Sequence, residues 1–288
     1  MITKVLLYIN QPFRSLRNGF FYFTMIEINK LARDLKLVRE KSPLIHNITN
    51  YVVMNNTANA ILSIGASPVM AHSKDEVADM TAIASALVIN IGTLDAEWVE
   101  AMLIAGKTAL AKSIPMILDP VGAGATPYRL KVCKQLIEQC KPSIIRGNAS
   151  EIMSLSSIHT ATKGVDSIDS SDKALNSARE LAKQTGAVLV ISGERDYITD
   201  GTRVETVDNG SPMMARVTGL GCTASAIVAA FAAINNNFIE ASAHAMSIMG
   251  ICGEIAAAKS KGNGSLQVNF LDELYNIDES VIKKHIRL

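Results

Sequence analysis

The segment Pro115-Met116-Ile117-Leu118-Asp119-Pro120-Val121-Gly122-Ala123-Gly124 is the clearest sign of the fold class of this chain. Its first part is a short apolar run, typical of a strand buried on both faces, and the run ends at the carboxylate of Asp119. A glycine-rich turn follows, and a helical pattern extends from about Pro127 to Cys140. Because a strand, a turn and a helix form most of a βαβ unit, the segment predicts an α/β protein with parallel strands.

The same alternation of apolar strands and helices continues on both sides of this segment. Strands are predicted at 87–92, 143–146 and 187–193, followed by an antiparallel pair at 197–200 and 203–207. Two Ala-rich helices, at 222–234 and 239–260, are apolar on most sides and are predicted to be buried. The expected fold is one domain with a central, mostly parallel sheet flanked by helices on both faces.

The first 24 residues differ from the rest of the chain. They carry Lys4, Arg14 and Arg17 but no acidic residue, and their apolar patch is too short for a signal-peptide core. Met25 then opens a clean helical pattern. We therefore expect 1–24 to be an N-terminal extension, either disordered or the product of a start assigned too early, and 25–288 to be the folded domain.

Composition argues against several classes of function. The 288 residues carry 28 basic and 27 acidic side chains without a long basic run, so neither nucleic acid nor a membrane surface is an expected partner. The most apolar stretch, 224–234, is shorter than the roughly 20 residues that a membrane span needs. The four cysteines, Cys133, Cys140, Cys222 and Cys252, form no C-x-x-C pair, which indicates reduced thiols in a cytoplasmic protein.

Polar residues follow the predicted strands at the edge of the sheet where ligands bind in open α/β folds. They include Asn90, Asp119, Arg146 and Ser192. Because the carboxyl ends of parallel strands share one edge, these side chains are expected to lie close together. Their clustering is more informative than any single member.

The turn Thr218-Gly219-Leu220-Gly221-Cys222 precedes a buried helix. Its two glycines let the backbone approach a ligand, and the free N–H groups of the helix stabilise negative charge. Since phosphoryl transfer depends on positioning and charge neutralisation, the turn suits the reaction centre of a small-molecule kinase that uses ATP. Alone, the turn fits an ordinary loop-to-helix connection equally well.

Two further segments each allow two interpretations. The carboxylate of Glu151, near Asp119 in sheet order, could hold Mg²⁺ through waters. The spacing of Asn148 and Glu151 also fits a helix capping box. The polar run from His46 to Asn50 is either a strand-end binding loop or a turn that caps the following helix, and His46 alone is more often structural than catalytic.

Six stretches, in this order, resemble one family. They are HNITNYVVMNNTAN (46–59), GASPVMA (65–71), LDPVGAGAT (118–126), IRGNASE (145–151), ISGE (191–194) and VTGLGC (217–222). From about Met25 to its C-terminus the chain resembles the hydroxyethylthiazole kinase family, which has the ribokinase-like fold. The first 24 residues have no counterpart in this resemblance.

The resemblance implies a reaction, a cofactor and an assembly. ATP and 4-methyl-5-(2-hydroxyethyl)thiazole give the thiazole phosphate and ADP in thiamine salvage, with Mg²⁺ as cofactor. The family is typically a homotrimer with active sites between subunits. The matching motif positions would bind the thiazole alcohol through Met70, Gly219, Asn50 and Val52, ATP through Arg146 and Ser192, and the metal through Asp119 and Glu151.

The cysteine of the turn has two possible roles. Ribokinase-like enzymes generally place an aspartate base at this position, and the family resembles them with a cysteine, here Cys222. A free thiol has a pKa of about 8.5, which a helix N-terminus can lower, so Cys222 could act as a partly ionised base. Alternatively the thiol only positions the acceptor hydroxyl, since a loose transition state needs no strong base.

Two other functions compete with this one. Another ribokinase-like activity, such as hydroxymethylpyrimidine kinase, is disfavoured by the HNITN and GASPVM segments. A nucleotide-binding regulator without turnover is disfavoured by the complete set of Asp119, Glu151 and the glycine turn with Cys222.

Overall fold

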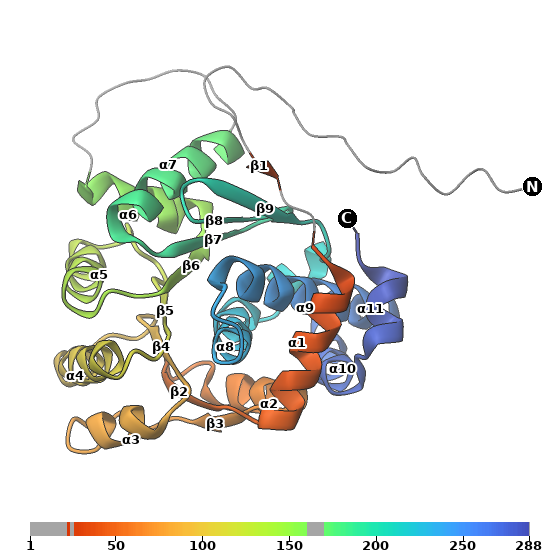
Figure 1. Ribbon diagram of the computed structural model, residues 1–288, viewed down its shortest axis with the longest axis horizontal. Coiled ribbons are helices and arrows are strands. Elements are labelled where there is room, and N and C mark those ends of the chain that lie inside the picture. The colour runs from red at the N-terminus through yellow and green to blue at the C-terminus, as the bar shows by residue number, and fades with distance from the viewer. Residues whose placement is uncertain (1–21, 24–25, 160–169, 288) are drawn as a thin grey trace, which may run out of the picture.

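A nine-stranded sheet separates two layers of helices in the computed structural model of this protein (Figure 1). The structure describes residues 22–23, 26–159 and 170–287. The strands lie in the order β1-β9-β8-β7-β6-β5-β4-β2-β3, and every neighbouring pair is parallel except those that β8 forms with β7 and β9. The predicted single-domain α/β fold with a mostly parallel sheet is confirmed.

The strands are short and match the apolar runs of the sequence. They are β1 (Tyr22–Phe23), β2 (Leu44–Ile48), β3 (Ser67–Val69), β4 (Ala86–Asn90), β5 (Met116–Asp119), β6 (Ile144–Asn148), β7 (Val188–Ser192), β8 (Asp196–Thr199) and β9 (Arg203–Val207). The antiparallel β8–β9 pair lies where the sequence predicts it. The strand β2 and the small edge strands β1 and β3 were not predicted.

Five helices cover one face of the sheet and six cover the other (Figure 1), counting only the described residues. The first layer holds α3 (Val77–Ile83), α4 (Ala96–Lys112), α5 (Pro127–Cys140), α6 (Ala149–His159) and α7 (Ser170–Thr185). The second holds α1 (Ile28–Lys41), α2 (Met54–Ile64), α8 (Leu220–Ala232), α9 (Phe238–Lys259), α10 (Asn263–Asn276) and α11 (Glu279–His285), with a 3₁₀ turn at Pro212–Arg216. The sequence predicted neither α10 nor α11.

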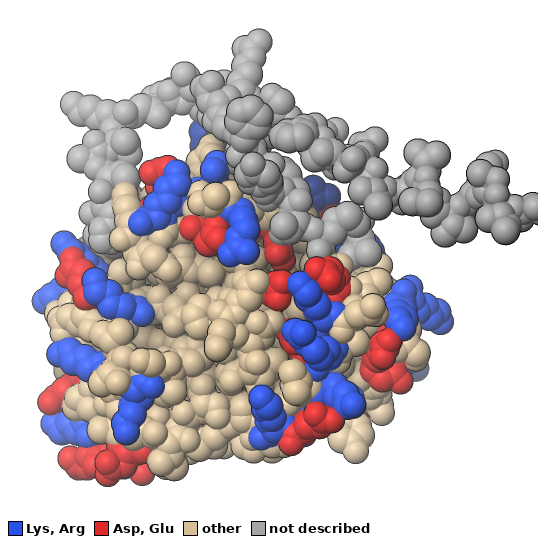
Figure 2. Space-filling view, in the orientation of Figure 1, with Lys and Arg blue, Asp and Glu red and all other residues tan. Residues whose placement is uncertain are grey.

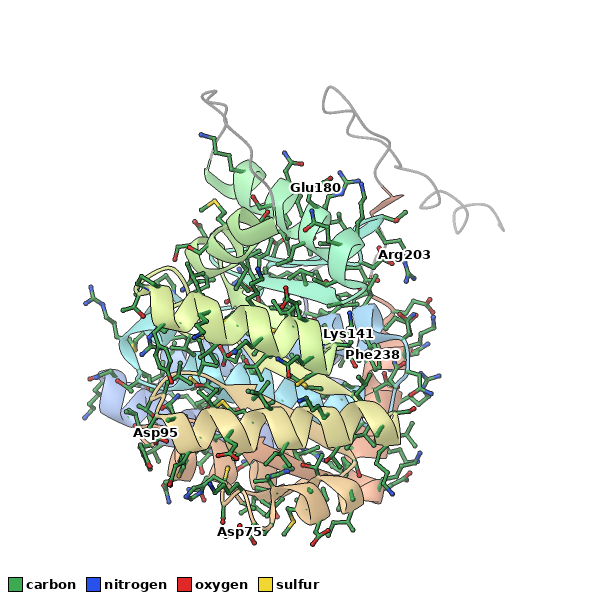
Figure 3. All side chains as sticks on the ribbon, turned by 90° about the vertical axis from the view of Figure 1, so that its left-hand side faces the viewer. Asp75, Asp95, Lys141, Glu180, Arg203 and Phe238 are labelled. Carbon is green, nitrogen blue, oxygen red and sulfur yellow. The ribbon has the colours of Figure 1, made fainter. Side chains whose placement is uncertain are left out.

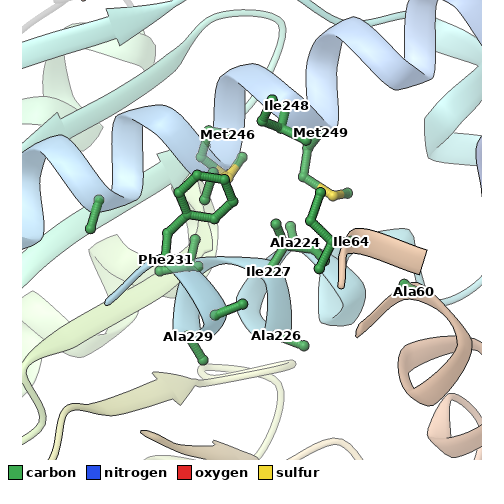
Figure 4. Packing of buried hydrophobic residues seen from close by; sticks show 14 of the residues in the cluster. Ala60, Ile64, Ala224, Ala226, Ile227, Ala229, Phe231, Met246, Ile248 and Met249 are labelled. Carbon is green, nitrogen blue, oxygen red and sulfur yellow. The ribbon is translucent and has the colours of Figure 1, made fainter. Parts of the chain in front are cut away.

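Alternation along each strand divides the interior into two cores. In β5, Ile117 faces the core under α8 and α9, whereas Met116 and Leu118 face the core under α4 and α5. Burial on both faces explains why the strand is apolar at every position before Asp119. Figure 4 shows the first core, where Phe231 of α8 packs against Met246 of α9.

Helix ends fix the direction of the chain at each crossover. The Asp95 side chain caps α4 by accepting a hydrogen bond from the Trp98 N–H at 2.9 Å. In Figure 3, α4 runs from Asp95 and the neighbouring α5 runs in the same direction to Lys141. Both helices therefore begin at the edge where the parallel strands end, and the residues after those strands meet there.

The predictions for residues 1–24 fall outside the described part of the chain except at Tyr22–Phe23. These two residues pair with β9, with Tyr22 opposite Arg203. On the face seen in Figure 2, basic and acidic side chains are interspersed around the rim. None of the helices in the described ranges is both long and apolar enough to cross a membrane.

Candidate active site

The carboxyl ends of the central strands hold a cluster of buried polar side chains. Sheet register sets Asn90 of β4 directly beside Asp119 of β5, and Asn148 of β6 beside Ser192 of β7. Asn90 and Asp119 are almost fully buried, at 1% and 2% exposure. The predicted gathering of polar residues at this edge is present in the structure.

A continuous hydrogen-bonded chain runs through this cluster to the thiol of the glycine turn. Asn90 Nδ2 donates to Asp119 Oδ2 at 2.8 Å. Asn50 Nδ2 donates to Asn90 Oδ1 at 2.9 Å and also to Cys222 Sγ at 3.5 Å. Ser225 Oγ, one turn further along α8, donates to the same Asp119 oxygen at 2.8 Å. The network thus joins the ends of β2, β4 and β5 to the start of α8.

Burial changes the acidity of the two titratable groups in this network. It raises the pKa of Asp119 to about 6, opposed chiefly by the positive charge of Arg146. It also raises the pKa of the Cys222 thiol to about 11, and the negative charge of Asp119 adds to this rise. The possibility that the helix N-terminus lowers the thiol pKa is therefore not realised, because burial outweighs it and the thiol is protonated near neutral pH.

Arg146 connects the strand ends to the glycine turn on the other side of the site. Its Nη1 donates to the Gly221 carbonyl at 2.9 Å, and its Nη2 donates to Ser192 Oγ at 2.6 Å. Its Nε is buried and has no hydrogen-bond partner within the described residues. Arg146 and Ser192, both expected to contact ATP, thus touch each other beside the turn.

Glu151 forms the predicted capping box at the start of α6. Its Oε2 accepts from the Asn148 N–H at 2.8 Å, and its own N–H donates to Asn148 Oδ1 at 3.0 Å. Its second oxygen, Oε1, accepts from the Gly122 N–H at 2.8 Å. The carboxylate therefore ties α6 to the turn after β5, and this turn begins at Asp119.

The carboxylates of Asp119 and Glu151 form a donor set that suits Mg²⁺, because this ion needs few protein ligands. The Glu151 charge contributes to the raised pKa of Asp119, so the two groups lie within electrostatic range of each other. Within the ranges that the structure describes, no three His, Cys, Asp or Glu side chains form a cage that could hold a metal alone. Mg²⁺ commonly uses one or two carboxylates together with waters and substrate phosphates, which matches this pair.

The glycine turn packs closely against the start of α2. Gly219 has φ +90°, and a Cβ atom at this position would lie 2.8 Å from Val53 Cγ1. Both the left-handed backbone and the contact therefore require glycine. A second link between these helices is the Asn56 amide, which donates to Thr223 Oγ1 at 2.9 Å.

The segment from His46 to Asn50 separates into a part that is buried in the core and a part that faces the polar network. Burial lowers the pKa of His46, whose ring nitrogens contact Thr81 Oγ1 and the Ala71 carbonyl, so His46 is a hydrogen-bonded core residue. Asn50 instead faces the network. β2 ends at Ile48, the Val53 N–H donates to the Asn50 carbonyl at 3.3 Å, and α2 begins at Met54. The segment is thus a loop at the end of a strand that also forms the turn into the next helix, and its role in binding stays a prediction.

Two predicted acceptor residues lie away from the network within one subunit. Met70 follows the edge strand β3, two strands beyond β4 in the sheet, and is half-buried. The Val52 side chain is 67% exposed, although its N–H donates to Asn50 Oδ1 at 3.1 Å. The chain therefore gathers Asn50, Gly219 and Cys222 but leaves Met70 half-buried and Val52 exposed, away from them.

Three residues of this edge were not among the predicted site residues. Asn90 is the centre of the network, Ser225 holds Asp119, and Arg129 of α5 donates to the carbonyls of Ile91, Val121 and Gly92 at 2.9, 2.5 and 2.8 Å. Asn90 was expected in the strand-end cluster from its place level with Asp119, but the sequence assigned it no role. The other two lie inside helical patterns that give no sign of such contacts.

Solved structures with little sequence similarity share this fold. A ribokinase-like superfamily protein from Enterococcus faecalis matches with a TM-score of 0.64 at 15% identity, covering 96% of this chain and 100% of that one. This match shows the fold alone, an α/β arrangement of the kind seen in ribokinase-like proteins.

The particular family follows from closer relatives. The chain belongs to the hydroxyethylthiazole kinase family, whose model matches residues 35–280. It is 54% identical to a hydroxyethylthiazole kinase of Syntrophus aciditrophicus over 88% of this chain and 94% of that protein, and 52% identical to one of Leptospira biflexa over 90% and 97%. The structure of a hydroxyethylthiazole kinase protein from Pyrococcus horikoshii matches with a TM-score of 0.84 and 39% identity, covering 90% and 98%.

Proposed function

We propose that the chain transfers the γ-phosphoryl group of ATP to the hydroxyl of 4-methyl-5-(2-hydroxyethyl)thiazole, giving the thiazole phosphate and ADP for thiamine salvage. The observation that carries the proposal is the junction of the Gly219 turn with the strand-end network at Cys222, in a chain of this family. The alcohol oxygen forms a bond to the γ-phosphorus while the bond from that phosphorus to the ADP oxygen breaks. The alcohol proton is released.

The α8 N-terminus and Arg146 supply positive potential where negative charge gathers in the transition state. The free N–H groups of the first helical turn belong to the Gly219–Cys222 segment itself. Arg146 already contacts the Gly221 carbonyl, and its free Nε adds a donor for a phosphate oxygen. Ser192 holds the guanidinium in place. These residues favour transfer by positioning and charge rather than by covalent chemistry.

Asp119 and Glu151 are the residues that would hold Mg²⁺, through waters and alongside the phosphates of ATP. When bound, the ion neutralises charge on those phosphates. The residues of this chain orient the reactants around it. Asn90 and Ser225 keep the Asp119 carboxylate fixed, and the capping contacts keep Glu151 beside the turn after β5.

The protonated thiol of Cys222 supports the positioning role rather than that of a base. With a pKa of about 11 the thiol carries its proton near pH 7, so it acts as a hydrogen-bonding partner of the acceptor hydroxyl. Asn50, which donates to Cys222 Sγ, borders the same acceptor position.

All four cysteines are free thiols, which supports the expected cytoplasmic location.

A homotrimer with active sites between subunits accounts for the residues left at the surface. Val52 and Leu62 near α2, and Val268 on the adjacent α10, are 57–67% exposed although apolar. A neighbouring subunit at this face would cover them and bring Met70 towards a Gly219 turn. Analytical ultracentrifugation is expected to give three times the 30.9 kDa chain mass, and a monomer with full activity contradicts the assembly.

An ADP-release assay tests the reaction itself. The thiazole alcohol and a hydroxymethylpyrimidine are offered separately, each with and without Mg²⁺. ADP is expected only with the thiazole alcohol and Mg²⁺, and mass spectrometry of the product should show one added phosphate. Faster turnover of the pyrimidine indicates the related kinase activity, and ATP binding by calorimetry without ADP release indicates a regulator.

A further inference from the structure

Asn90 occupies the only position of the network that touches both its nucleotide side and its acceptor side among the described residues. Its Nδ2 donates to Asp119, and its Oδ1 accepts from Asn50 and, at 2.9 Å, from the Gly92 N–H. The side chain is 1% exposed. A buried amide with three partners at 2.8–2.9 Å is held in one orientation.

The orientation of this amide follows from its partners. The Gly92 N–H can only donate, so the atom of Asn90 that faces it is the oxygen. The nitrogen therefore faces the Asp119 carboxylate, which accepts. No exchange of the two amide atoms satisfies both contacts.

The same logic extends one residue further, to Asn50. The fixed Asn90 oxygen requires the nitrogen of Asn50, and the Val52 N–H requires its oxygen. The second hydrogen of Asn50 Nδ2 is then directed at Cys222 Sγ. The Asn50 side chain cannot move aside, because it lies directly against the backbone of Gly92, where a Cβ atom would be 2.7 Å from Nδ2.

We infer that Asn90 is a positioning residue of the kinase, whose oxygen orients Asn50 and thereby the acceptor end of the site while its nitrogen orients the Asp119 carboxylate. The inference rests on the proposed function for its kinetic consequences. In this inference the amide oxygen of Asn90 serves the site of the alcohol, and its amide nitrogen serves the site of ATP. Loss of the oxygen half affects binding of the alcohol, and loss of the nitrogen half affects the rate of transfer.

Three variants separate the two halves. Asn90→Ala removes both. Asn90→Asp keeps an oxygen for Asn50 and Gly92 but cannot donate to Asp119 once its carboxyl is ionised, so its kinetics are measured at a pH above both steps of this coupled carboxyl pair. Ser225→Ala removes the other donor to Asp119 while leaving Asn50 untouched. We expect the KM for the alcohol to rise about tenfold in Asn90→Ala, the size of one lost buried hydrogen bond. The KM for the alcohol should stay within about twofold of the native value in Asn90→Asp and Ser225→Ala, and the kcat of both variants should fall.

A double-mutant cycle distinguishes positioning from general structural damage. If Asn90 acts through Asn50, the KM for the alcohol in Asn50→Ala/Asn90→Ala equals that of Asn50→Ala alone. A merely structural role predicts additive losses that follow the melting temperature. Equal alcohol KM values in Asn90→Ala and the native enzyme overturn the inference, as does additivity in the cycle. Asn90→Ser, whose hydroxyl ends one bond short of the amide atoms, replaces Asn90→Ala if that variant does not fold.

A measurement without turnover keeps this inference separate from the proposed reaction. Alkylation of Cys222 by iodoacetamide, located by peptide mass spectrometry, depends on the amide groups beside the sulfur, because Asn50 donates to it and Asn90 also lowers the thiol pKa. Comparing Asn50→Ala with Asn50→Ala/Asn90→Ala therefore isolates the direct influence of Asn90. We expect a rate at least about twofold lower in Asn90→Ala, because the thiolate loses a correctly aimed donor. An unchanged rate overturns the inference whatever the substrate is. If the native enzyme phosphorylates no thiazole alcohol but alkylation is still slower in Asn90→Ala than in the native enzyme, only the proposed function is contradicted.

Discussion

The two ends of helix α8 both carry buried polar clusters, but the clusters differ in whether their polar atoms all have protein partners. At the C-terminal end, Asn235 Nδ2 donates to Asp34 Oδ2 at 2.6 Å, His244 Nδ1 donates to the same oxygen at 2.8 Å, and Arg33 pairs with the other oxygen. Every carboxylate oxygen there has protein partners. At the N-terminal end, Arg146 Nε is unpaired and Cys222 is only half-buried.

This difference separates a cluster that holds the fold together from one that is prepared for a ligand. A closed cluster gains nothing further from a small molecule, whereas buried donors without partners are stabilised when one arrives. The helix between the clusters is about 20 Å long at 1.5 Å per residue, so changes at one end should have little effect on the other. Mutations at each end test that separation.

The largest effect is expected from Gly219→Ala at the open end. The substitution forces an alanine to φ +90° and sets its Cβ 2.8 Å from Val53 Cγ1, so the turn must shift away from α2. Since a displacement of about 1 Å in an active site can cost roughly 100-fold, kcat/KM should fall by that order, as measured by ADP release.

Gly264→Ala is the matched control for this change. Gly264 is also in the first turn of a helix, but no heavy atom lies within 4 Å of a Cβ built on it. Its kcat/KM should stay within about twofold of the native value. Equal losses in both variants indicate that the activity does not depend on the shape of the Gly219 turn.

The open end could be predicted from the sequence to a large extent, and the closed end could not. Asn90 and Asp119 were predicted to cluster because residues at the ends of parallel strands share one edge. The helix boundaries of α5 matched because Pro127 and the apolar spacing are local signals. The closed cluster joins Asp34 to partners 201 and 210 residues away, and nothing local marks such a contact.

The acidity of Cys222 shows the same limit. From the sequence, only the helix N-terminus is visible, and it favours a low pKa. The opposing influences, burial and the charge of Asp119, come from segments more than 100 residues away and prevail in the folded protein. Similarly, the spacing of Asn148 and Glu151 revealed a capping box, but the contact of Glu151 with Gly122 required the structure.

A smaller effect on kcat is expected from substitution of Cys222, and its size decides whether this thiol at the open end acts as a base. Because the Cys222 pKa is raised to about 11, Cys222→Ala should lower kcat by roughly tenfold, less than the 10²–10⁴ that a general base contributes, with little change in KM. Cys222→Asp should remain active. The native kcat should show no thiol ionisation between pH 7 and 9.

Cys222→Ser is the control for that pH profile, since a hydroxyl does not ionise in this range. A limb near pH 8.5 that is present in the native enzyme and absent from Cys222→Ser identifies the thiolate as the base. An unchanged kcat in Cys222→Ala removes any catalytic contribution of the thiol.

The smallest effect on activity is expected at the closed end, from Asp34→Asn. Burial alone would raise the pKa of Asp34, but hydrogen bonds from His244, Asn235 and Arg33 outweigh it and hold the pKa below its usual value. Removing the charge weakens those contacts and should lower the free energy of unfolding by roughly 1–3 kcal/mol at pH 7, with kcat at 25 °C unchanged.

The pH dependence gives this prediction its sign. Because the folded-state pKa is lower than the unfolded value of about 3.9, the carboxylate stabilises the fold above that pH, and the contribution is lost as the pH falls through the folded-state pKa. The stability gap between the native protein and Asp34→Asn, measured by urea unfolding, should therefore be full at pH 7 and shrink below about pH 4. Asp272→Asn, at an exposed carboxylate of α10 away from the N-terminus of its helix, should show neither the loss nor the trend. If Asp34→Asn lowers kcat under conditions in which the variant is fully folded, the two ends of α8 are coupled, and the closed cluster contributes to the mechanism.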